Sequence, residues 1–212
     1  MKALIKNNPK YYKVIEYTTS GTYTFTAPKN ANCSVILVGA GGGGASCHFM
    51  AWERGRNGGQ GAKVTGSIDL VQGNSYTFVV GSGGTGQRIA DTGGNANGTA
   101  GGDTTAFGNT AGGGQGSGAH TGYYDGGSDW GGDGGTATAV SGFTGENGAN
   151  YSTASKYLTY GGGGVGNAST AGNGQGGYIR ISYESDASDY TYRVDDYTAK
   201  VYEKDNVYKA FK

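Results

Sequence analysis

The chain has 212 residues, 46 of them glycine, and its 16 basic and 16 acidic side chains balance to a net charge of zero. This balance, without any block of like charge, excludes the basic surface typical of nucleic-acid-binding proteins. Only 2 prolines accompany the glycines, which excludes collagen, and 12% of the residues are aromatic, which argues against a disordered linker.

The N-terminal segment, residues 1–20, begins with MKALIKNNPKYYK and has no apolar core, so we expect no secretory signal there. Within it, YYKVIEY at 11–17 predicts a strand. We therefore expect this segment to be a strand and attachment element.

Further strands are predicted on both sides of a glycine-rich middle. Gly21 opens one in which threonines alternate with Tyr23 and Phe25, and Pro28 ends it. CSVILV at 33–38 is continuous and apolar, which predicts a strand buried on both faces. The remaining predicted strands are 63–70, 76–80 and 178–183. The simplest closure pairs the first strand with the last in one small β-sandwich.

All glycines except Gly21 lie between Gly39 and Gly177, in clusters separated by stretches that hold Trp, Tyr and Phe. Glycine has no side chain to bury and loses the most entropy on ordering, so such a segment must gain stability elsewhere. Polyproline II helices have three residues per turn and no internal hydrogen bonds, and glycine lets them pair through their backbones. We predict a mainly β fold over 21–183, a small β-sandwich joined to a bundle of polyproline II (polyglycine II) helices, with few or no α-helices.

The C-terminal extension, residues 184–212, has no glycine and alternates tyrosine and apolar residues with polar ones. Two interpretations stay open: an extended segment that pairs with another subunit, or a polar tail. The first makes tyrosines the assembly candidates, because a tyrosine buries its ring and still satisfies its hydroxyl. These candidates are Tyr190, Tyr192, Tyr197 and Tyr202.

Seven stretches occur in a characteristic order: GTYTFTAP, SVILVGAGGGG, GGQGAKVTGSIDL, GNSYTFVVGSGGTG, GGDTTAFG, GGGQG and GGYIRISY. Residues 20–183 thereby resemble the glycine-rich domains of bacteriophage tail-fibre and receptor-binding proteins. The resemblance implies strands followed by polyglycine II helices, loops that bind host receptors, and homo-oligomers that are commonly trimers. A similar pattern occurs in extracellular regions of animal receptor kinases related to anaplastic lymphoma kinase.

The expected function is therefore that of a phage virion surface protein, assembled in the host cytoplasm, which displays receptor-binding loops on a polyglycine II scaffold. A purely structural fibre or capsid-decoration protein is the alternative, and a nucleotide-binding enzyme is a remote one. The expected partners are copies of itself, other virion proteins and a host surface protein or glycan. We expect neither nucleic-acid binding nor membrane insertion, because no stretch approaches the ~20 apolar residues of a membrane span.

Loops that combine aromatic, charged and amide side chains are the candidate binding sites, since such residues dominate adaptable recognition surfaces. An alternative stays open, in which these aromatics cover the ends of the bundle as its core. The receptor-binding candidates are His48, Trp52, Arg54, Tyr123, Tyr124, Trp130, Phe143, Tyr151 and Tyr157.

One motif suggests a cofactor. The glycines of 39–44 match the dinucleotide fingerprint after a predicted strand, but no second β-α-β unit follows and Asp69 lies in a predicted strand. We expect no cofactor.

Catalytic and metal sites have little support. Asp125, Asp129 and Asp133 recur every four residues, yet they do not match a calcium-binding loop. Cys47 and His48 are adjacent and would point to opposite faces of an extended chain. We expect a non-enzymatic protein without a metal, and leave open whether Cys33 and Cys47 form a disulfide.

Overall fold

The computed structural model describes residues 10–46, 56–88, 97–118, 131–150, 160–166, 171–186, 192–195 and 200–203. Strands, turns and extended segments account for these residues. Nowhere in them is there a helix long and apolar enough to cross a membrane. The prediction of a mainly β fold is confirmed.

The strands form two antiparallel sheets and one short parallel pair. In chain order they are β1 (Lys10–Tyr17), β2 (Gly21–Thr26), β3 (Ala31–Val38), β4 (Ala45–Ser46), β5 (Lys63–Leu70), β6 (Ser75–Val80), β7 (Gln87–Arg88), β8 (Thr104–Ala106), β9 (Asn109–Ala111), β10 (Ala137–Thr138), β11 (Phe143–Glu146), β12 (Tyr178–Ser185), β13 (Tyr192–Asp195) and β14 (Lys200–Glu203). The large sheet has the order β11-β5-β3-β12-β1-β13-β14 and the small sheet β10-β9-β8-β6-β2, while β4 and β7 pair in parallel.

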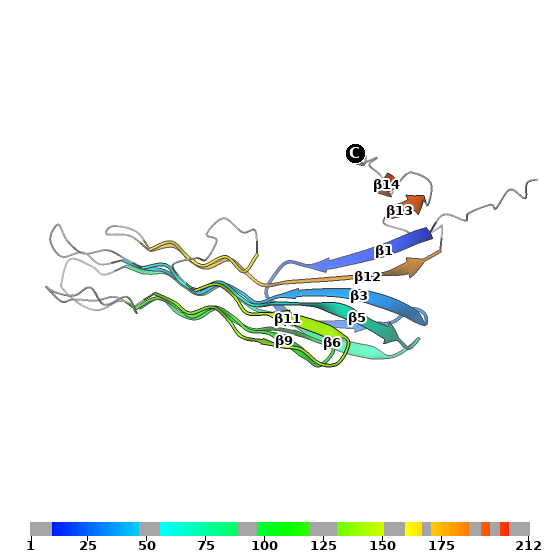
Figure 1. The fold of residues 1–212 in the computed structure, drawn as a ribbon, viewed down its shortest axis with the longest axis horizontal. Coiled ribbons are helices and arrows are strands. Elements are labelled where there is room, and N and C mark those ends of the chain that lie inside the picture. Colours follow the sequence, from blue (N-terminus) through cyan, green and yellow to red (C-terminus); the bar gives the residue numbers. More distant parts are fainter. Residues whose placement is uncertain are drawn as a thin grey trace, which may run out of the picture.

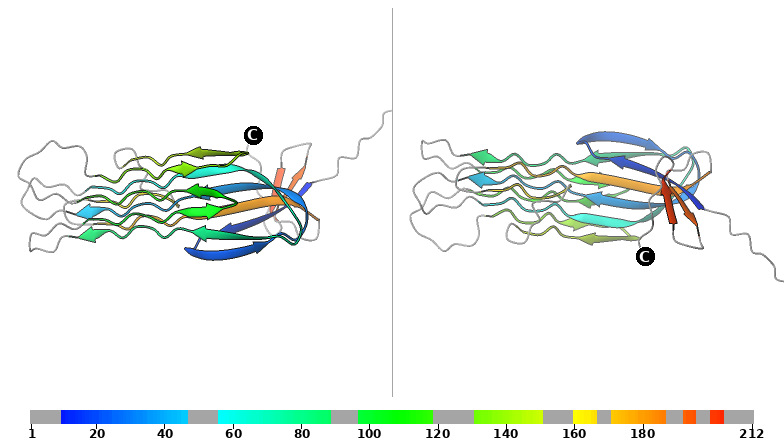
Figure 2. Two further views of the ribbon diagram at one scale, coloured as in Figure 1. Left: turned by 90° about the horizontal axis from the view of Figure 1, so that it is seen from below. Right: turned by 90° about the horizontal axis from the view of Figure 1, so that it is seen from above.

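The molecule is elongated, with the sheets at one end and the glycine-rich segments at the other (Figure 1). The small sheet packs against one face of the large sheet (Figure 1), and the strands of both, except β13 and β14, run roughly along the long axis (Figure 2). The glycine-rich segments continue directly from the strands. We call the end with the sheets the near end and the opposite end the far end.

The first and last predicted strands pair as expected. Antiparallel β1 and β12 join from Tyr11↔Ser185 to Tyr17↔Ile179, and β12 then pairs with β3. The expectation for 33–38 is only half right. Cys33, Val35 and Leu37 are buried between the sheets, but Ser34 is exposed on the outer face, so this strand has one buried face.

The space between the sheets is filled by large apolar side chains. Phe78 is fully buried, and its ring stacks on that of Phe25 at a centroid distance of 5.9 Å. Leu37 and Ile179 are equally buried. Burying each such side chain contributes roughly 1.5–3 kcal/mol, so this sandwich has an ordinary hydrophobic core.

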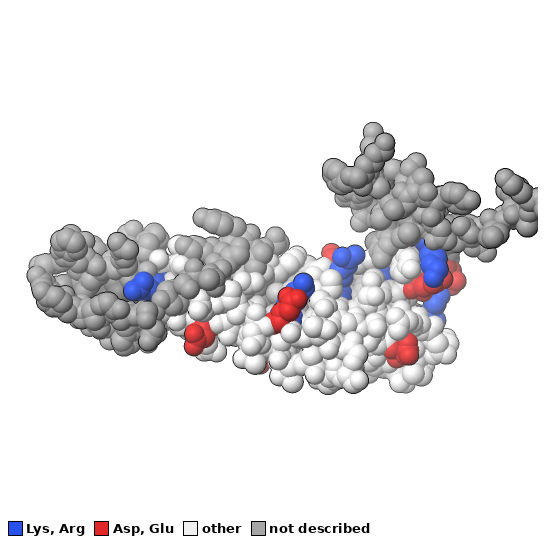
Figure 3. Space-filling model, viewed as in Figure 1, with Lys and Arg blue, Asp and Glu red and all other residues white. Residues whose placement is uncertain are grey.

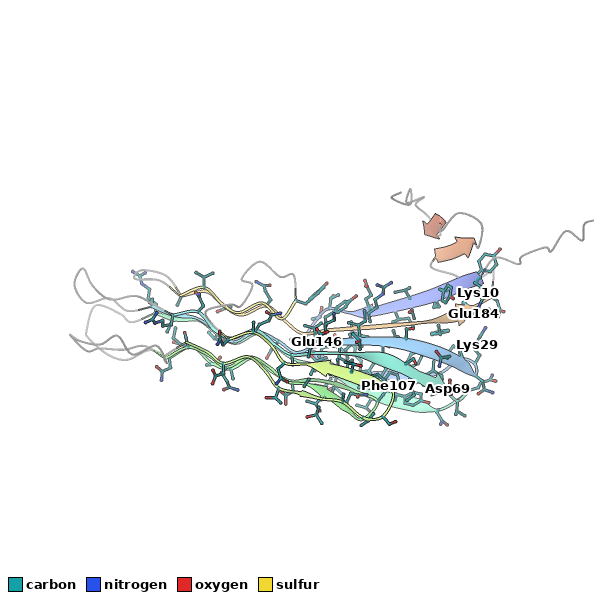
Figure 4. The ribbon with its side chains drawn as sticks, in the orientation of Figure 1. Lys10, Lys29, Asp69, Phe107, Glu146 and Glu184 are labelled. Atoms are coloured by element: carbon teal, nitrogen blue, oxygen red, sulfur yellow. The ribbon has the colours of Figure 1, made fainter. Side chains whose placement is uncertain are left out.

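A tight hairpin between β8 and β9 brings one aromatic residue into that core. Phe107 (φ 52°) and Gly108 (φ 76°) form the turn, and both have the positive φ that a type I′ turn requires. The Phe107 ring lies 5.0 Å from that of Phe78, and its position at the small sheet is labelled in Figure 4. The buried Asn109 side chain donates to the Phe107 carbonyl and accepts from the Val140 amide. The sequence pattern did not predict β8 or β9.

Two strands of the C-terminal extension pair with strands of their own chain. β13 pairs with β1, and β14 pairs with β13. The extension is therefore strand-forming where it is described, and it adds to the large sheet of its own subunit. The hypothesis of pairing with another subunit now concerns the outer side of β14.

Candidate functional site

The glycine-rich segments form one assembly, which we call the glycine array. Its segments are extended and bonded to one another through their backbones. They are residues 39–46, 56–62, 81–88, 97–103, 112–118, 131–136, 147–150, 161–166 and 171–177.

Segment 39–46 is the centre of the array. All of its residues are buried. Its amides donate in rotation to three neighbouring segments, and the rotation repeats every three residues. The donor and acceptor pairs are Gly39 to Ala62, Ala40 to Gly102, Gly41 to Gln175, Gly42 to Gly59, Gly43 to Thr99, Gly44 to Gly172 and Ala45 to Arg56.

The carbonyls of this central segment serve three other neighbours in the same rotation. Ala40 accepts from Gly114, Gly41 from Gly84, Gly42 from Gly164, Gly43 from Ser117 and Gly44 from Gln87. Six described segments thus surround the central one: 56–62, 112–118, 97–103, 81–88, 171–177 and 161–166. Each of these also bonds to the next, which closes a ring.

Close backbone contact explains the glycines. A Cβ atom added to Gly42 would lie well inside contact distance of the Gln115 carbonyl oxygen, and one added to Gly58 would meet that of Gly42. Gly41 would meet Gly162 in the same way. Backbone cannot move aside as the end of a side chain can, so the interior of the array admits few residues other than glycine.

Short polar side chains cap the amides at the edge of the array. The Thr99 hydroxyl accepts from the Thr85 amide at 2.7 Å, and the Asn173 side-chain oxygen accepts from the Gly86 amide at 2.8 Å. Asp103, Asn57 and Asn147 accept in the same way from Gly113, Gly166 and Ala137. These residues replace the neighbouring segment that an edge amide lacks. Sequence reasoning missed them, although Asn, Asp or Thr between glycines was the available signal.

The far end gathers the ends of four pairs of segments. The chain leaves the described residues there after Ser46, Arg88, Gly118 and Gly166, and returns at Arg56, Asn97, Gly131 and Ala171. Bridges join Ala45 to Arg56 and Gly166 to Ala171, and β4 pairs with β7. The Ser117 hydroxyl also donates to the Arg56 carbonyl at 2.8 Å. The described residues that flank these four parts of the sequence are thus held close together by backbone hydrogen bonds.

Charge is unevenly distributed over the described residues. In the array the charged side chains among them are Arg56, Arg88, Asp103 and Asp133. The face seen in Figure 3 shows a denser group of charges at the near end.

At the near end a polar hollow of about 530 Å³ crosses the outer face of β1, β12 and β3. Lys10 pairs with Glu184 at 3.5 Å and Lys29 with Asp186 at 3.8 Å along its wall (Figure 4). Exposed pairs of this kind contribute little to stability.

Three side chains of the large sheet have shifted pKa values. Burial, followed by the hydrogen bond from its hydroxyl to Glu16, raises the pKa of Tyr178, whose ring stacks on Tyr160 at 4.4 Å. Burial, with a smaller contribution from Tyr23, raises the pKa of Tyr17. Burial raises the pKa of the free Cys33 thiol to about 11. These shifts stabilise the neutral forms, which suits packing more than proton transfer.

The candidate binding residues fall into three groups. His48, Trp52, Arg54, Tyr123, Tyr124 and Trp130 lie outside the described residues, in segments whose described ends are both at the far end. Tyr151 and Tyr157 also lie outside, between Asn150 in the array and Tyr160 near the sheets. Phe143 requires a correction: it lies in β11 and packs against the sandwich core, so it is not a loop residue.

The assembly candidates are divided as well. Tyr192 lies in β13 and Tyr202 in β14, while Tyr190 and Tyr197 lie outside the described residues.

The glycines that match the dinucleotide fingerprint are the buried centre of the array. Gly44 is followed by β4, and Gly39–Gly44 meet other backbone segments on all sides. A pyrophosphate would need the space that these segments occupy. Within the described residues no cluster of three His, Cys, Asp or Glu side chains suits a metal ion; Asp125, Asp129, Cys47 and both histidines lie outside them.

Comparison with protein families gives a match over most of the chain. Residues 18–197 match a family described as a glycine-rich domain. A search of curated proteins gives no significant match. The family's description names a composition and no activity.

Proposed function

The chain belongs to the glycine-rich domain family over residues 18–197, and from this premise we propose that it is a non-enzymatic display scaffold on the surface of a phage virion. Its array is a polyglycine II bundle, and its far end carries segments that bind a host surface protein or glycan. It is assembled in the host cytoplasm and acts outside the cell as part of a tail fibre or another appendage.

The period of three in the array supports polyglycine II. Donors and acceptors of segment 39–46 return to the same neighbour every third residue, as a helix with three residues per turn requires. In segment 81–88, Ser82 and Thr85 are exposed three residues apart, and Gly81 and Gly84 are buried at the same spacing. No glycine of the described array except Gly161 has a positive φ, which agrees with the negative φ of polyproline II.

The observation that carries the proposal is the grouping, at the far end, of the described residues that flank four connecting parts of the sequence. A binding surface needs loops that a rigid support holds in place. Here the support is the hydrogen-bonded array. The two sheets, with β1 and β13, lie at the opposite end of the molecule (Figure 1). Such a polarity suits attachment at the near end and recognition at the far end.

The residue types of the far-end connections fit recognition. The segments 47–55 and 119–130 contain His48, Trp52, Arg54, Tyr123, Tyr124 and Trp130. Trp, Tyr and Arg contribute most of the binding energy in protein interfaces, and aromatic faces also pack on sugar rings. The array itself has few charged groups, so specificity would come from these connections.

The test compares connections at the far end with one elsewhere. We expect Trp52→Ala and Trp130→Ala to reduce binding of the purified chain to cells of its host at least tenfold. Val71→Ala is the control, since Val71 is an exposed apolar side chain between β5 and β6, in the sandwich. Far-ultraviolet circular dichroism and thermal unfolding would show that all three variants fold. Equal binding by all three would contradict the proposal.

A structural fibre or capsid-decoration protein is the second candidate. What favours it is the tyrosine-rich extension, because β13 and β14 widen the large sheet and leave the outer side of β14 as its edge. Tyr190, Tyr192, Tyr197 and Tyr202 would then contact a sibling subunit or another virion protein, in a homo-oligomer such as a trimer. A wild-type chain that does not bind host cells would favour this candidate.

A further inference from the structure

The small sheet has an edge that is not protected by the usual devices. β2 pairs along its whole length with β6, from Gly21↔Val80 to Thr26↔Ser75. No described strand lies on its other side, where β2 ends the sheet (Figure 2). Such an edge presents unpaired backbone donors and acceptors, which are a template for another strand.

The other described edges are short or charged. β10 has 2 residues. β11 has 4 residues and ends in Glu146, and β14 has 4 residues that include Lys200 and Glu203. β2 has 6 residues without a charged or proline residue, and its exposed side chains are threonines. Proteins usually protect edges with charge, proline or short length, so β2 is the edge on which pairing is least opposed.

The sequence of β2 is complementary to itself. Around Thr24 the strand reads Thr-Tyr-Thr-Phe-Thr over residues 22–26. An antiparallel pair centred on Thr24 places Thr22 opposite Thr26 and Tyr23 opposite Phe25 of the second copy. Threonine pairs and aromatic pairs are favourable neighbours across strands, and no like charges meet.

We propose that β2 is an interaction edge at which two copies of this chain pair antiparallel, so that their small sheets join into one continuous sheet. The strands run along the long axis, so the two glycine arrays would point in opposite directions and each dimer would present two far ends. This surface is separate from the far end and from β14.

The expected association is weak, because one short strand pair buries much less than the ~1,200–2,000 Å² of a stable interface. Sedimentation equilibrium of the full chain should therefore be measured up to about 100 µM. We expect the mass to rise from the 21.5 kDa of a single chain towards twice that value as the concentration increases.

A matched pair of lysine variants tests the edge. Thr24 and Thr77 are register partners on β2 and β6, and both side chains are exposed. Thr24→Lys would place two like charges opposite each other across the dimer axis and should abolish the increase in mass. Thr77→Lys lies on the same face of an interior strand and should behave as the wild type. Thermal unfolding should be unchanged in both.

Two outcomes would overturn the proposal. One is a wild-type chain that stays at 21.5 kDa at every concentration. The other is a Thr24→Lys variant that associates as strongly as the wild type, which would place the contact on another surface. Hydrogen exchange supplies an independent readout, because dimerisation should slow the outward-facing amides of β2 and leave those of β10 unchanged.

Discussion

The two halves of the molecule exclude water by different means. Between the sheets, side chains fill the space, with Phe78 and Leu37 fully buried. In the array, backbone fills the space, and Gly41–Gly44 are buried without contributing a side chain. The sandwich is therefore sensitive to the removal of atoms and the array to their addition.

The same chain segments serve both halves. β3 continues into the central segment 39–46, and β12 continues from segment 171–177. Within a sheet each strand bonds to two neighbours in one plane, whereas in the array the donors rotate among three. Glycine makes this change of packing possible, because without Cβ atoms a segment can be approached closely from every side.

The strongest test of this comparison is a methyl group in the middle of the array. Gly42→Ala should lower the free energy of unfolding by about 3 kcal/mol, because its Cβ meets the Gln115 carbonyl and backbone has no room to retreat. Gly176→Ala is the control: the nearest atom to its Cβ is the Gly81 oxygen at 3.9 Å. Urea unfolding measures both. A similar cost for both would mean that backbone packing does not require glycine at the centre.

The sandwich can be tested through its buried thiol. The pKa of Cys33 is about 11 in the fold against an ordinary value of 9.0, so the neutral thiol is favoured in the folded state. The contribution is complete below pH 9 and is lost as the pH rises towards 11, by about 2 kcal/mol. Cys33→Ala should lower stability at neutral pH and show a smaller decrease across this range.

The measurement is urea unfolding between pH 8 and pH 11. Tyrosines also ionise there, but they are common to both proteins, so the difference between wild type and Cys33→Ala isolates the thiol. Parallel curves would contradict the assignment. The array contains no such group among its described residues, so this pH dependence reports on the sandwich.

Much of the sandwich could be predicted because its strands show alternation. Tyr23 and Phe25 alternate with threonines in β2, and Ile179 and Ile181 alternate in β12, so these strands follow from side-chain period. The β1–β12 pairing was expected only because it is the simplest way to close the sandwich. β8–β9 could not be predicted in this way. Its strands have 3 residues each, and its turn places Phe107 at a positive φ that sequence patterns do not favour.

The close backbone packing of the array could be predicted from its glycines, but the arrangement of its segments could not. Glycine clusters indicate close backbone approach, yet nothing in their spacing says which cluster becomes the centre. That choice depends on contacts distant in sequence, such as Gly41 to Gln175. The candidate site stays a prediction: the tryptophans and tyrosines suggested its segments, and only the grouping of the described residues that flank them follows from the array. Phe143 misled because an aromatic residue near glycines is equally suited to a core.

The smallest expected effect concerns the edge of the array, where side chains replace backbone. The Asn173 oxygen accepts from the Gly86 amide at 2.8 Å. Asn173→Ala should cost about 1 kcal/mol, because water replaces part of the lost bond. Exchange of the Gly86 amide should accelerate more clearly, since the loss is local. Asn173→Asp keeps an acceptor and should preserve protection, and Gln175→Ala, which changes an exposed side chain in the same segment, should leave it unchanged. If Asn173→Ala leaves the exchange of the Gly86 amide unaltered, the edge of the array does not depend on hydrogen bonds from side chains.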